Sequence, residues 1–576
     1  MNGVDRPVLI RNARVYSFDD ADSTADAILI EAGRVAAVGD GQALHARAGA
    51  PIETWNVRGA TILPGLIDTH PHLLHFAARQ APLVDIMTAV SHDQIVRRFA
   101  DRAKSAPAGE WILTTPVGEP HYFIRRSYKD MEEGELPTRH VLDRATNQHP
   151  VAIQAWEPNI PNTAVFNSLA LRELGITRDL PDRVGNVSIE KDAAGEPTGR
   201  LHGAINGVYS GEEFAYQLWR KIPRTIGSEL MLDATRRAVA SHHGLGVTGI
   251  YENHMMYKHH IEVYRRLRKS GELNMRVTVS QESDSFGTAW SRPRTLDELM
   301  RGLEDAAASI ELSDDYFRFN GVSIQWDGGC YPGHMMMREA YYGPDGAETR
   351  GRHMMDPEKI EAVMRFCAER RIRLNTLCVG TQAHEDNLGM LENLAADHDI
   401  RSLRWILVHT PFIEPEQVKR YSRLDFDITT TMTYLFGMGD LFRKRFKPER
   451  RDAMIEDLLP LRRFFDAGLA VGAGADWGPR NVFEQIQLAL LHRTPSGYSN
   501  LGAAQKISRT QAISMWTRDA ARVLQWNDIG RLSPGAHADL IILDRDPATC
   551  PVEDIAGTRV LRTLFDGRTV YDAGEL

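Results

Sequence analysis

Eight short apolar segments, each followed by a polar or glycine-rich turn and then by a helical pattern, recur through the middle of this chain of 576 residues. They cover residues 61–68, 247–252, 275–280, 321–325, 373–378, 405–409, 426–432 and 470–476. Eight strand–helix repeats favour a closed parallel (β/α)₈ barrel, in which catalytic groups lie at the carboxyl ends of the strands. An α/β fold built on a TIM-like barrel is therefore predicted.

Short strands are also expected at both ends of the chain, over residues 8–16, 27–31, 35–39, 538–544 and 560–571. Each end is too small to bury a core alone, so the two are expected to pack together as one small β-sandwich domain. The predicted domains are this sandwich, from residues 1–60 and 528–576, and a barrel over 61–527.

Residues from about 80 to 235 do not fit the strand–helix alternation and contain one strand-like segment, 151–156. We expect an insertion over the barrel mouth that could shape a substrate pocket, with simple extra packing on the rim as the alternative.

A formal net charge of -9 argues against nucleic acid as the partner, because phosphate binding needs clustered Lys and Arg. The four cysteines, Cys330, Cys367, Cys378 and Cys550, follow no regular spacing and are expected to be reduced thiols of a cytoplasmic protein. Neither a signal peptide nor a membrane-spanning run of apolar residues is expected. These features leave a small-molecule substrate as the predicted partner.

Potential metal ligands stand at the ends of three predicted strands. His70 and His72 are spaced i and i+2, which points both side chains to the same side of an extended chain. His409 and Asp476 end two other strands. Imidazole and carboxylate together suit Zn²⁺ and its borderline neighbours, so the sequence predicts a zinc site at this end of the barrel.

Other polar residues near strand ends are candidates for contact with the substrate. Glu252 and His254 follow the second strand, where each could be a ligand, an acid or base, or a partner in loop hydrogen bonds. Gln325, Asp327 and Trp477 are further candidates for substrate binding. Cys378 is expected to be a buried structural thiol, although it could also supply a soft ligand, and His384 is expected to be a surface or packing histidine.

Two segments carry a resemblance to a known family. Leu-Pro-Gly-Leu-Ile-Asp-Thr-His-Pro-His at 63–72 resembles the first-strand signature of the amidohydrolase superfamily, and Gly-Ala-His-Ala-Asp-Leu-Ile at 535–541 is similar to its C-terminal sandwich segment. With residues 167–171 and 326–329, the chain looks most like the YtcJ-like branch, amidohydrolase family 3, over essentially its whole length. The resemblance implies a cytoplasmic hydrolase of C–N bonds, commonly in amides or N-acyl groups, with one or two divalent metals, and suggests a homo-oligomer such as a dimer.

Three positions depart from the pattern of that family. Gln325 stands where relatives with two metals have a carboxylated bridging lysine, Leu377 stands where the branch has a fifth-strand histidine, and Asn162 replaces a substrate-facing histidine. In the family, His70, His72 and Asp476 correspond to one metal position, and the residues replaced by Gln325 and Leu377 belong to the other. The resemblance therefore implies one ion, most simply Zn²⁺, held by His70, His72 and Asp476, with His409 either completing the site or facing the substrate.

The predicted function is hydrolysis of an amide, N-acyl or related C–N bond in a small apolar or aromatic molecule by a metal-activated water. Asp476 would orient and deprotonate the water, and Asp476 or His409 would assist the leaving amine. Two alternatives stay open: a non-hydrolytic lyase or decarboxylase on the same barrel, and a catalytically impaired subunit or binding protein.

Overall fold

The computed structural model describes residues 6–48, 52–80, 83–118, 126–155, 161–207, 210–222, 228–284, 293–328, 333–343, 346–494, 496–497 and 503–576. Trp156, the last residue of the strand expected at 151–156, and Cys330 lie outside the described residues.

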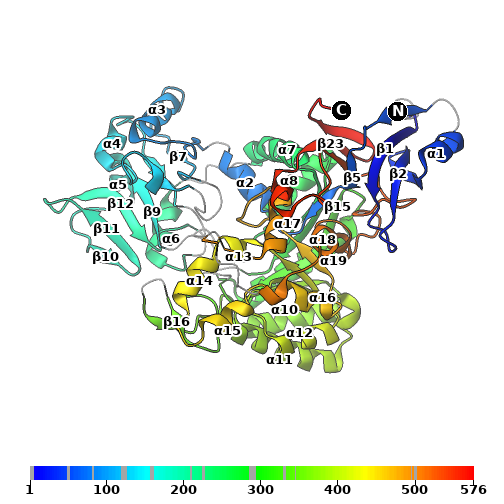
Figure 1. Cartoon of the computed structure of the whole chain (residues 1–576). Coiled ribbons are helices and arrows are strands. Elements are labelled where there is room, and N and C mark those ends of the chain that lie inside the picture. The colour runs from blue at the N-terminus through cyan, green and yellow to red at the C-terminus, as the bar shows by residue number, and fades with distance from the viewer. Residues whose placement is uncertain are drawn as a thin grey trace.

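Eight parallel strands form the predicted barrel at the centre of the molecule (Figure 1). In spatial order they are β6 (Leu66–Asp68), β13 (Val247–Glu252), β14 (Arg276–Glu282), β15 (Phe317–Gln325), β18 (Leu374–Cys378), β19 (Ile406–His409), β20 (Asp427–Thr430) and β21 (Val471–Ala473). Backbone hydrogen bonds from Thr69 N to Ala473 O (3.0 Å) and from Asp476 N to His70 O (2.7 Å) join the first strand to the last. The predicted barrel fold is confirmed.

The barrel has apolar side chains on both faces of its strands, as expected for parallel strands that are covered on both sides. Inside, Ile67, Tyr251, Leu377 and Val408 belong to one buried cluster, which also includes residues of α19 (Arg518–Val523). Outside, the strands pack on helices, of which the longer ones are α2 (Leu73–Gln80), α7 (Ser228–Gly244), α8 (Lys258–Lys269), α9 (Leu296–Ser309), α10 (Pro357–Glu369), α11 (Thr381–Asp397), α12 (Pro415–Arg423) and α17 (Val482–Leu491). Polar residues at the strand ends are therefore the natural place for a site.

The first predicted strand, 61–68, is two strands in the structure, and this part of the prediction was wrong. β5 (Thr61–Pro64) pairs with β22 (Leu540–Leu543) in the sheet of the chain ends, and only β6 enters the barrel. Gly65 lies between the two strands, where a Cβ atom would come within 2.1 Å of Thr248 Oγ1. The chain can pass this close to β13 only without a side chain.

The two ends of the chain form one sheet in the order β24 (Arg568–Asp572), β23 (Val560–Phe565), β22, β5, β1 (Val8–Tyr16), β2 (Thr24–Glu31) and β3 (Arg34–Gly39), and β4 (Glu53–Asn56) pairs with β1. Ile10 and Ile28 from the first end share a buried cluster with Leu540 and Ile542 from the second. The pairing of the chain ends agrees with the predicted fold class, and both termini lie together in Figure 1. The exact domain limits stay a prediction.

The insertion contains a sheet of its own, in the order β10 (Arg183–Val184), β11 (Val187–Lys191), β12 (Pro197–Gly203), β9 (Asn162–Phe166), β8 (Val151–Ile153) and β7 (Ile112–Thr114). Helices α3 (His92–Ala103), α4 (Arg139–Asp143), α5 (Ser168–Leu174) and α6 (Glu213–Lys221) flank it. The expectation of one strand was wrong, because β7 and β8 have only three residues each, β10 has two, and an exposed residue interrupts the buried positions of β11. The insertion lies on the side of the barrel away from the sheet of the chain ends (Figure 1).

Among the described residues, no helix combines the length and apolar character that a membrane crossing requires.

Candidate metal centre

The first two ligand candidates follow β6 directly. The Nε2 atoms of His70 and His72 lie 3.1 Å apart, and both side chains are buried. Asp68, the last residue of β6, accepts hydrogen bonds at Oδ1 from His70 N (2.9 Å) and from Ala475 N (3.1 Å). Asp68 thereby holds the segment that carries His70 and His72 against the segment that carries Asp476.

Asp476 and His409 come to the same place from β21 and β19. Asp476 Oδ1 lies 3.2 Å from His72 Nε2 and 3.8 Å from His70 Nε2, and its Oδ2 lies 3.9 Å from His409 Nε2. The His409 ring stacks on His70 with 4.8 Å between centroids. The structure thus brings all four predicted ligands together.

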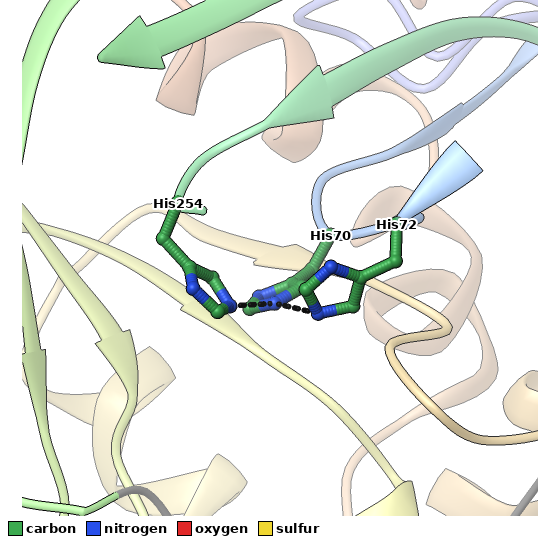
Figure 2. Close-up of side chains that lie close together, drawn as sticks. All are labelled: His70, His72 and His254. Atoms are coloured by element: carbon green, nitrogen blue, oxygen red, sulfur yellow. Dashed lines mark hydrogen bonds between the residues drawn. The ribbon is translucent and has the colours of Figure 1, made fainter. Parts of the chain in front are cut away.

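His254 joins them from the loop after β13. Its Nε2 atom lies 2.8 Å from His70 Nε2, and Figure 2 shows the two rings and His72 meeting through these nitrogens although they come from two separate segments. The three histidines offer ligand atoms within 4.8 Å of one another, as do His70, His409 and Asp476. His254 was predicted only among several possible roles, and its position favours that of a ligand.

Three of these residues have a left-handed backbone: φ is 47° at His72, 74° at His409 and 50° at Asp476. Residues other than glycine adopt positive φ infrequently, and such conformations concentrate at functional sites, where surrounding contacts hold them. The backbone departs from extended strand geometry at these three residues, and their side chains turn toward a common point.

The protonation states suit metal binding. Burial lowers the pKa of His70 and of His254 well below the usual value, and neighbouring imidazoles lower it further. Burial also lowers the pKa of His409 to about 4 and raises the pKa of Asp476 to about 6, which the charge of His409 opposes. Neutral imidazoles have the nitrogen lone pairs that a cation needs.

The donor set fits a divalent cation such as zinc. Both ring nitrogens of His409 are buried, and neither makes a hydrogen bond within the described part of the chain. Burial of polar atoms without a hydrogen bond is costly unless a bound ion, water or substrate satisfies them. Imidazole nitrogens with one carboxylate are typical zinc ligands.

Two asparagines that sequence reasoning missed support the centre. Asn253 Nδ2 donates to Thr69 O at 2.8 Å and lies 3.0 Å from His70 Nδ1, and the Asn375 side chain donates to Asn253 O. These contacts hold the backbone at Thr69 and place the Asn253 side chain against the His70 ring. The available signal was the position of Asn253, between two candidates at the end of a predicted strand.

Glu252 and Asp327 use their carboxylates to hold backbone. Glu252 Oε1 accepts from Leu74 N (3.1 Å) and from Tyr264 OH (2.8 Å), which anchors the start of α2, and burial raises the pKa of Glu252 to about 7. Asp327 accepts from the backbone of Met336 (2.9 Å), Val379 (3.0 Å) and Gly380 (2.9 Å). Neither carboxylate belongs to the group around His70, although Glu252 lies within 4.8 Å of ligand atoms of His72 and His75.

The remaining candidates divide into two groups. Trp477 stacks on His72 with 4.8 Å between centroids, and Gln325 is buried at the carboxyl end of β15, so both lie where a substrate could meet them. Cys378 is buried on the outer face of β18, and His384 lies 3.3 Å from Tyr421 OH, so neither joins the metal centre. The described cysteines, Cys367, Cys378 and Cys550, form no disulfide.

Comparisons with known proteins agree with this geometry. An N-substituted formamide deformylase of Arthrobacter pascens is 25% identical over 98% of each chain, and the putative amidohydrolase YtcJ of Bacillus subtilis is 23% identical over 97% of this chain and 98% of its own. Among solved structures, an uncharacterized metal-dependent hydrolase from Pyrococcus horikoshii matches with a TM-score of 0.69 and 17% identity, over 95% of this chain and 99% of that one. An atrazine chlorohydrolase from Arthrobacter aurescens complexed with zinc matches with a TM-score of 0.53 and 17% identity, over 98% and 95%.

A family model also matches most of the chain. The model described as the amidohydrolase family covers residues 53–571. The enzyme class predicted from the sequence, a metal-dependent amidohydrolase acting on carbon–nitrogen bonds other than peptide bonds, is thereby confirmed. The chain belongs to the amidohydrolase family.

Proposed function

We propose that this protein hydrolyses an N-formyl or other N-acyl bond of a small apolar or aromatic amine, with one Zn²⁺ held by His70, His72, His254 and Asp476. The observation that carries the proposal is the convergence of these four side chains with His409, all of them buried, at the carboxyl ends of the barrel strands. Parallel barrels place their active sites at this end.

The cation, when bound, supplies a Lewis acid that polarises the substrate carbonyl and generates a nucleophile from water near neutral pH. Asp476 accepts the proton of the attacking water at a carboxylate oxygen, a role that fits its raised pKa. His409 Nε2 lies 3.9 Å from Asp476 Oδ2 and is placed to pass a proton to the leaving nitrogen. Asp68 and Asn253 keep the ligand loops in position.

The residues at the neighbouring strand ends support one ion rather than two. Gln325 of β15 and Leu377 of β18 are register partners, and they replace the lysine and the histidine of a second metal position. Leu377 belongs to the apolar cluster inside the barrel, and a neutral amide and an aliphatic side chain give a second cation no anionic ligand.

Aromatic side chains around the centre favour an apolar or aromatic substituent on the substrate. Trp477 stacks on His72 and lies 5.1 Å from the Phe76 ring, and Tyr434 lies 5.3 Å from the His409 ring. The relative named as an N-substituted formamide deformylase supports formamides as the first compounds to test.

The test combines zinc analysis with turnover of N-formylbenzylamine in ¹⁸O-labelled water. About one zinc per chain and solvent oxygen in the released formate would support the proposal. Turnover without solvent oxygen would instead indicate non-hydrolytic chemistry. Protein without metal and without turnover would favour a binding protein. The predicted cytoplasmic location and homo-oligomer stay predictions.

A further inference from the structure

A pocket lies between the insertion and the barrel, and none of its lining residues belongs to the metal centre. It has a volume of about 440 Å³ and is lined by α6 of the insertion and by the segment before α10, with Tyr216, Arg220, Arg352 and Met355 among its residues. Pockets of this size are typical for small molecules. Figure 1 shows α6 on the side of the insertion that faces the barrel.

The pocket opens at the same end of the barrel as the metal centre. Met354 N donates to Trp326 O (2.9 Å), just beyond β15, and Met355 Sδ lies 4.0 Å from Ser283 Oγ, just beyond β14. Glu282, the residue before Ser283, accepts at Oε2 from the backbone of Met255 (2.9 Å), and Met255 follows His254 in the chain. Contacts at the ends of β14 and β15 thus link two lining residues of the pocket with the segment that carries His254.

The charges of the pocket are unbalanced. Arg220 pairs with Glu213 at 2.9 Å, so these two charges offset each other. Arg352 donates to His334 Nε2 at 3.0 Å and forms no ion pair within the described residues. The lining therefore has one guanidinium that no carboxylate of the described chain neutralises.

The other walls are apolar or aromatic. Met354 and Met355 are buried, and the Arg220 guanidinium lies 6.0 Å from the centroid of the Tyr216 ring. A guanidinium presents paired N–H donors that match a carboxylate, while methionine and tyrosine accommodate a carbon skeleton. Such a lining suits one end of an amphipathic molecule.

We infer that this pocket binds a carboxylate on the amine portion of the substrate, through Arg352, so that the preferred substrates are N-acyl amines with a remote acidic group. The inference depends on the proposed function for the reaction itself. It adds that the distal part of the substrate is anionic, with its skeleton lying over Met354 and Met355.

A matched series of compounds tests this assignment: N-formylbenzylamine, its 4-carboxy analogue and its 4-aminomethyl analogue. The wild-type kcat/KM is expected to be about tenfold higher for the carboxy compound than for the uncharged one, mainly through KM. Arg352→Gln should remove this preference, and Arg352→Glu should transfer it to the aminomethyl compound. Arg365→Gln, a change at an exposed residue of α10 outside the pocket, should leave the preference intact.

Failure of the inference can be separated from failure of the proposed function. Equal kcat/KM for the charged and uncharged compounds, unchanged by Arg352→Gln, would overturn the inference while the hydrolase stands. If none of the compounds is hydrolysed, calorimetric titration with the carboxy compound decides: binding to the wild type that Arg352→Gln weakens about tenfold supports the pocket. Binding that the variant does not change would reject it.

Discussion

The Nε2 atom of His254 lies 2.8 Å from the Nε2 atom of His70, although the two residues are 184 positions apart in the chain. Both rings are buried, and burial with nearby imidazoles keeps the pKa of each far below its usual value. Two neutral imidazoles that face each other this closely are well arranged to share a cation. His254 therefore adds a third imidazole to the two that follow β6.

His254→Gln is expected to weaken zinc binding by more than the roughly 10- to 100-fold that typically follows from changes beyond the direct ligands. The measurement is competitive zinc titration of the metal-free protein with a chromophoric chelator. His384→Gln changes another fully buried histidine, outside the metal centre, and should keep the wild-type affinity. Equal losses in both variants would remove His254 from the ligand set.

The number of ions can be tested at Gln325 and Leu377. The wild type should contain about one zinc per chain by elemental analysis, because these two positions offer no anionic ligand. The combined change Gln325→Lys and Leu377→His, in bicarbonate buffer, should raise the count toward two, while Leu377→His alone should not. Two ions in the wild type would contradict the single-metal assignment.

His409 and Asp476 should differ in their effects. His409→Gln is expected to keep about one zinc and to lower kcat by about 10²- to 10⁴-fold, the usual loss for a proton-transfer group. Asp476→Asn should lower both kcat and the zinc content, because its carboxylate serves both purposes. Zinc loss in the His409 variant equal to that in the Asp476 variant would mean that His409 is a ligand instead.

Arg276 links the barrel to the sheet of the chain ends. Its guanidinium is buried, donates to Asp539 at 2.9 and 3.1 Å and also pairs with Asp566. Arg276→Met should lower the free energy of unfolding by about 3–5 kcal/mol, because it leaves the buried carboxylate of Asp539 uncompensated.

Urea denaturation of the wild type and of Arg276→Met measures the loss in free energy of unfolding. The exposed pair Arg365–Glu361 provides the comparison, since Arg365→Gln should cost at most about 1 kcal/mol. A loss below about 1 kcal/mol in the Arg276 variant would show that this network contributes little.

His242 should make the protein less stable in mild acid. Burial lowers the pKa of His242 to about 4, and the charge of Arg480 adds to the effect. Between about pH 6.5 and 4 the unfolded chain binds a proton at this position and the folded protein does not, so the free energy of unfolding falls as the pH falls, by up to about 1.4 kcal/mol per unit.

His242→Gln tests this dependence, because glutamine can still donate to Ala238 O, which lies 2.8 Å from His242 Nδ1. The free energies of unfolding from urea denaturation at about pH 7 and 5 should differ less in the variant than in the wild type, by about 2 kcal/mol. An unchanged difference would assign the acid sensitivity to other groups.

The sequence by itself determined the barrel and part of its site. The strand segments could be recognised because apolar runs and turns are local patterns. The side chains of His70 and His72 were expected on the same side because residues two apart in an extended chain point the same way. His409 and Asp476 were predicted for a similar reason, since each ends a segment whose carboxyl end must face the same side of a parallel barrel.

Only the tertiary structure decided the rest. The division of 61–68 at Gly65 depends on its contact with Thr248, and the role of His254 depends on a distance to His70 that no local pattern encodes. The insertion sheet and the pocket at Arg352 likewise arise from segments far apart in the chain. Such contacts form when distant segments pack against one another, so their geometry is a property of the folded chain as a whole.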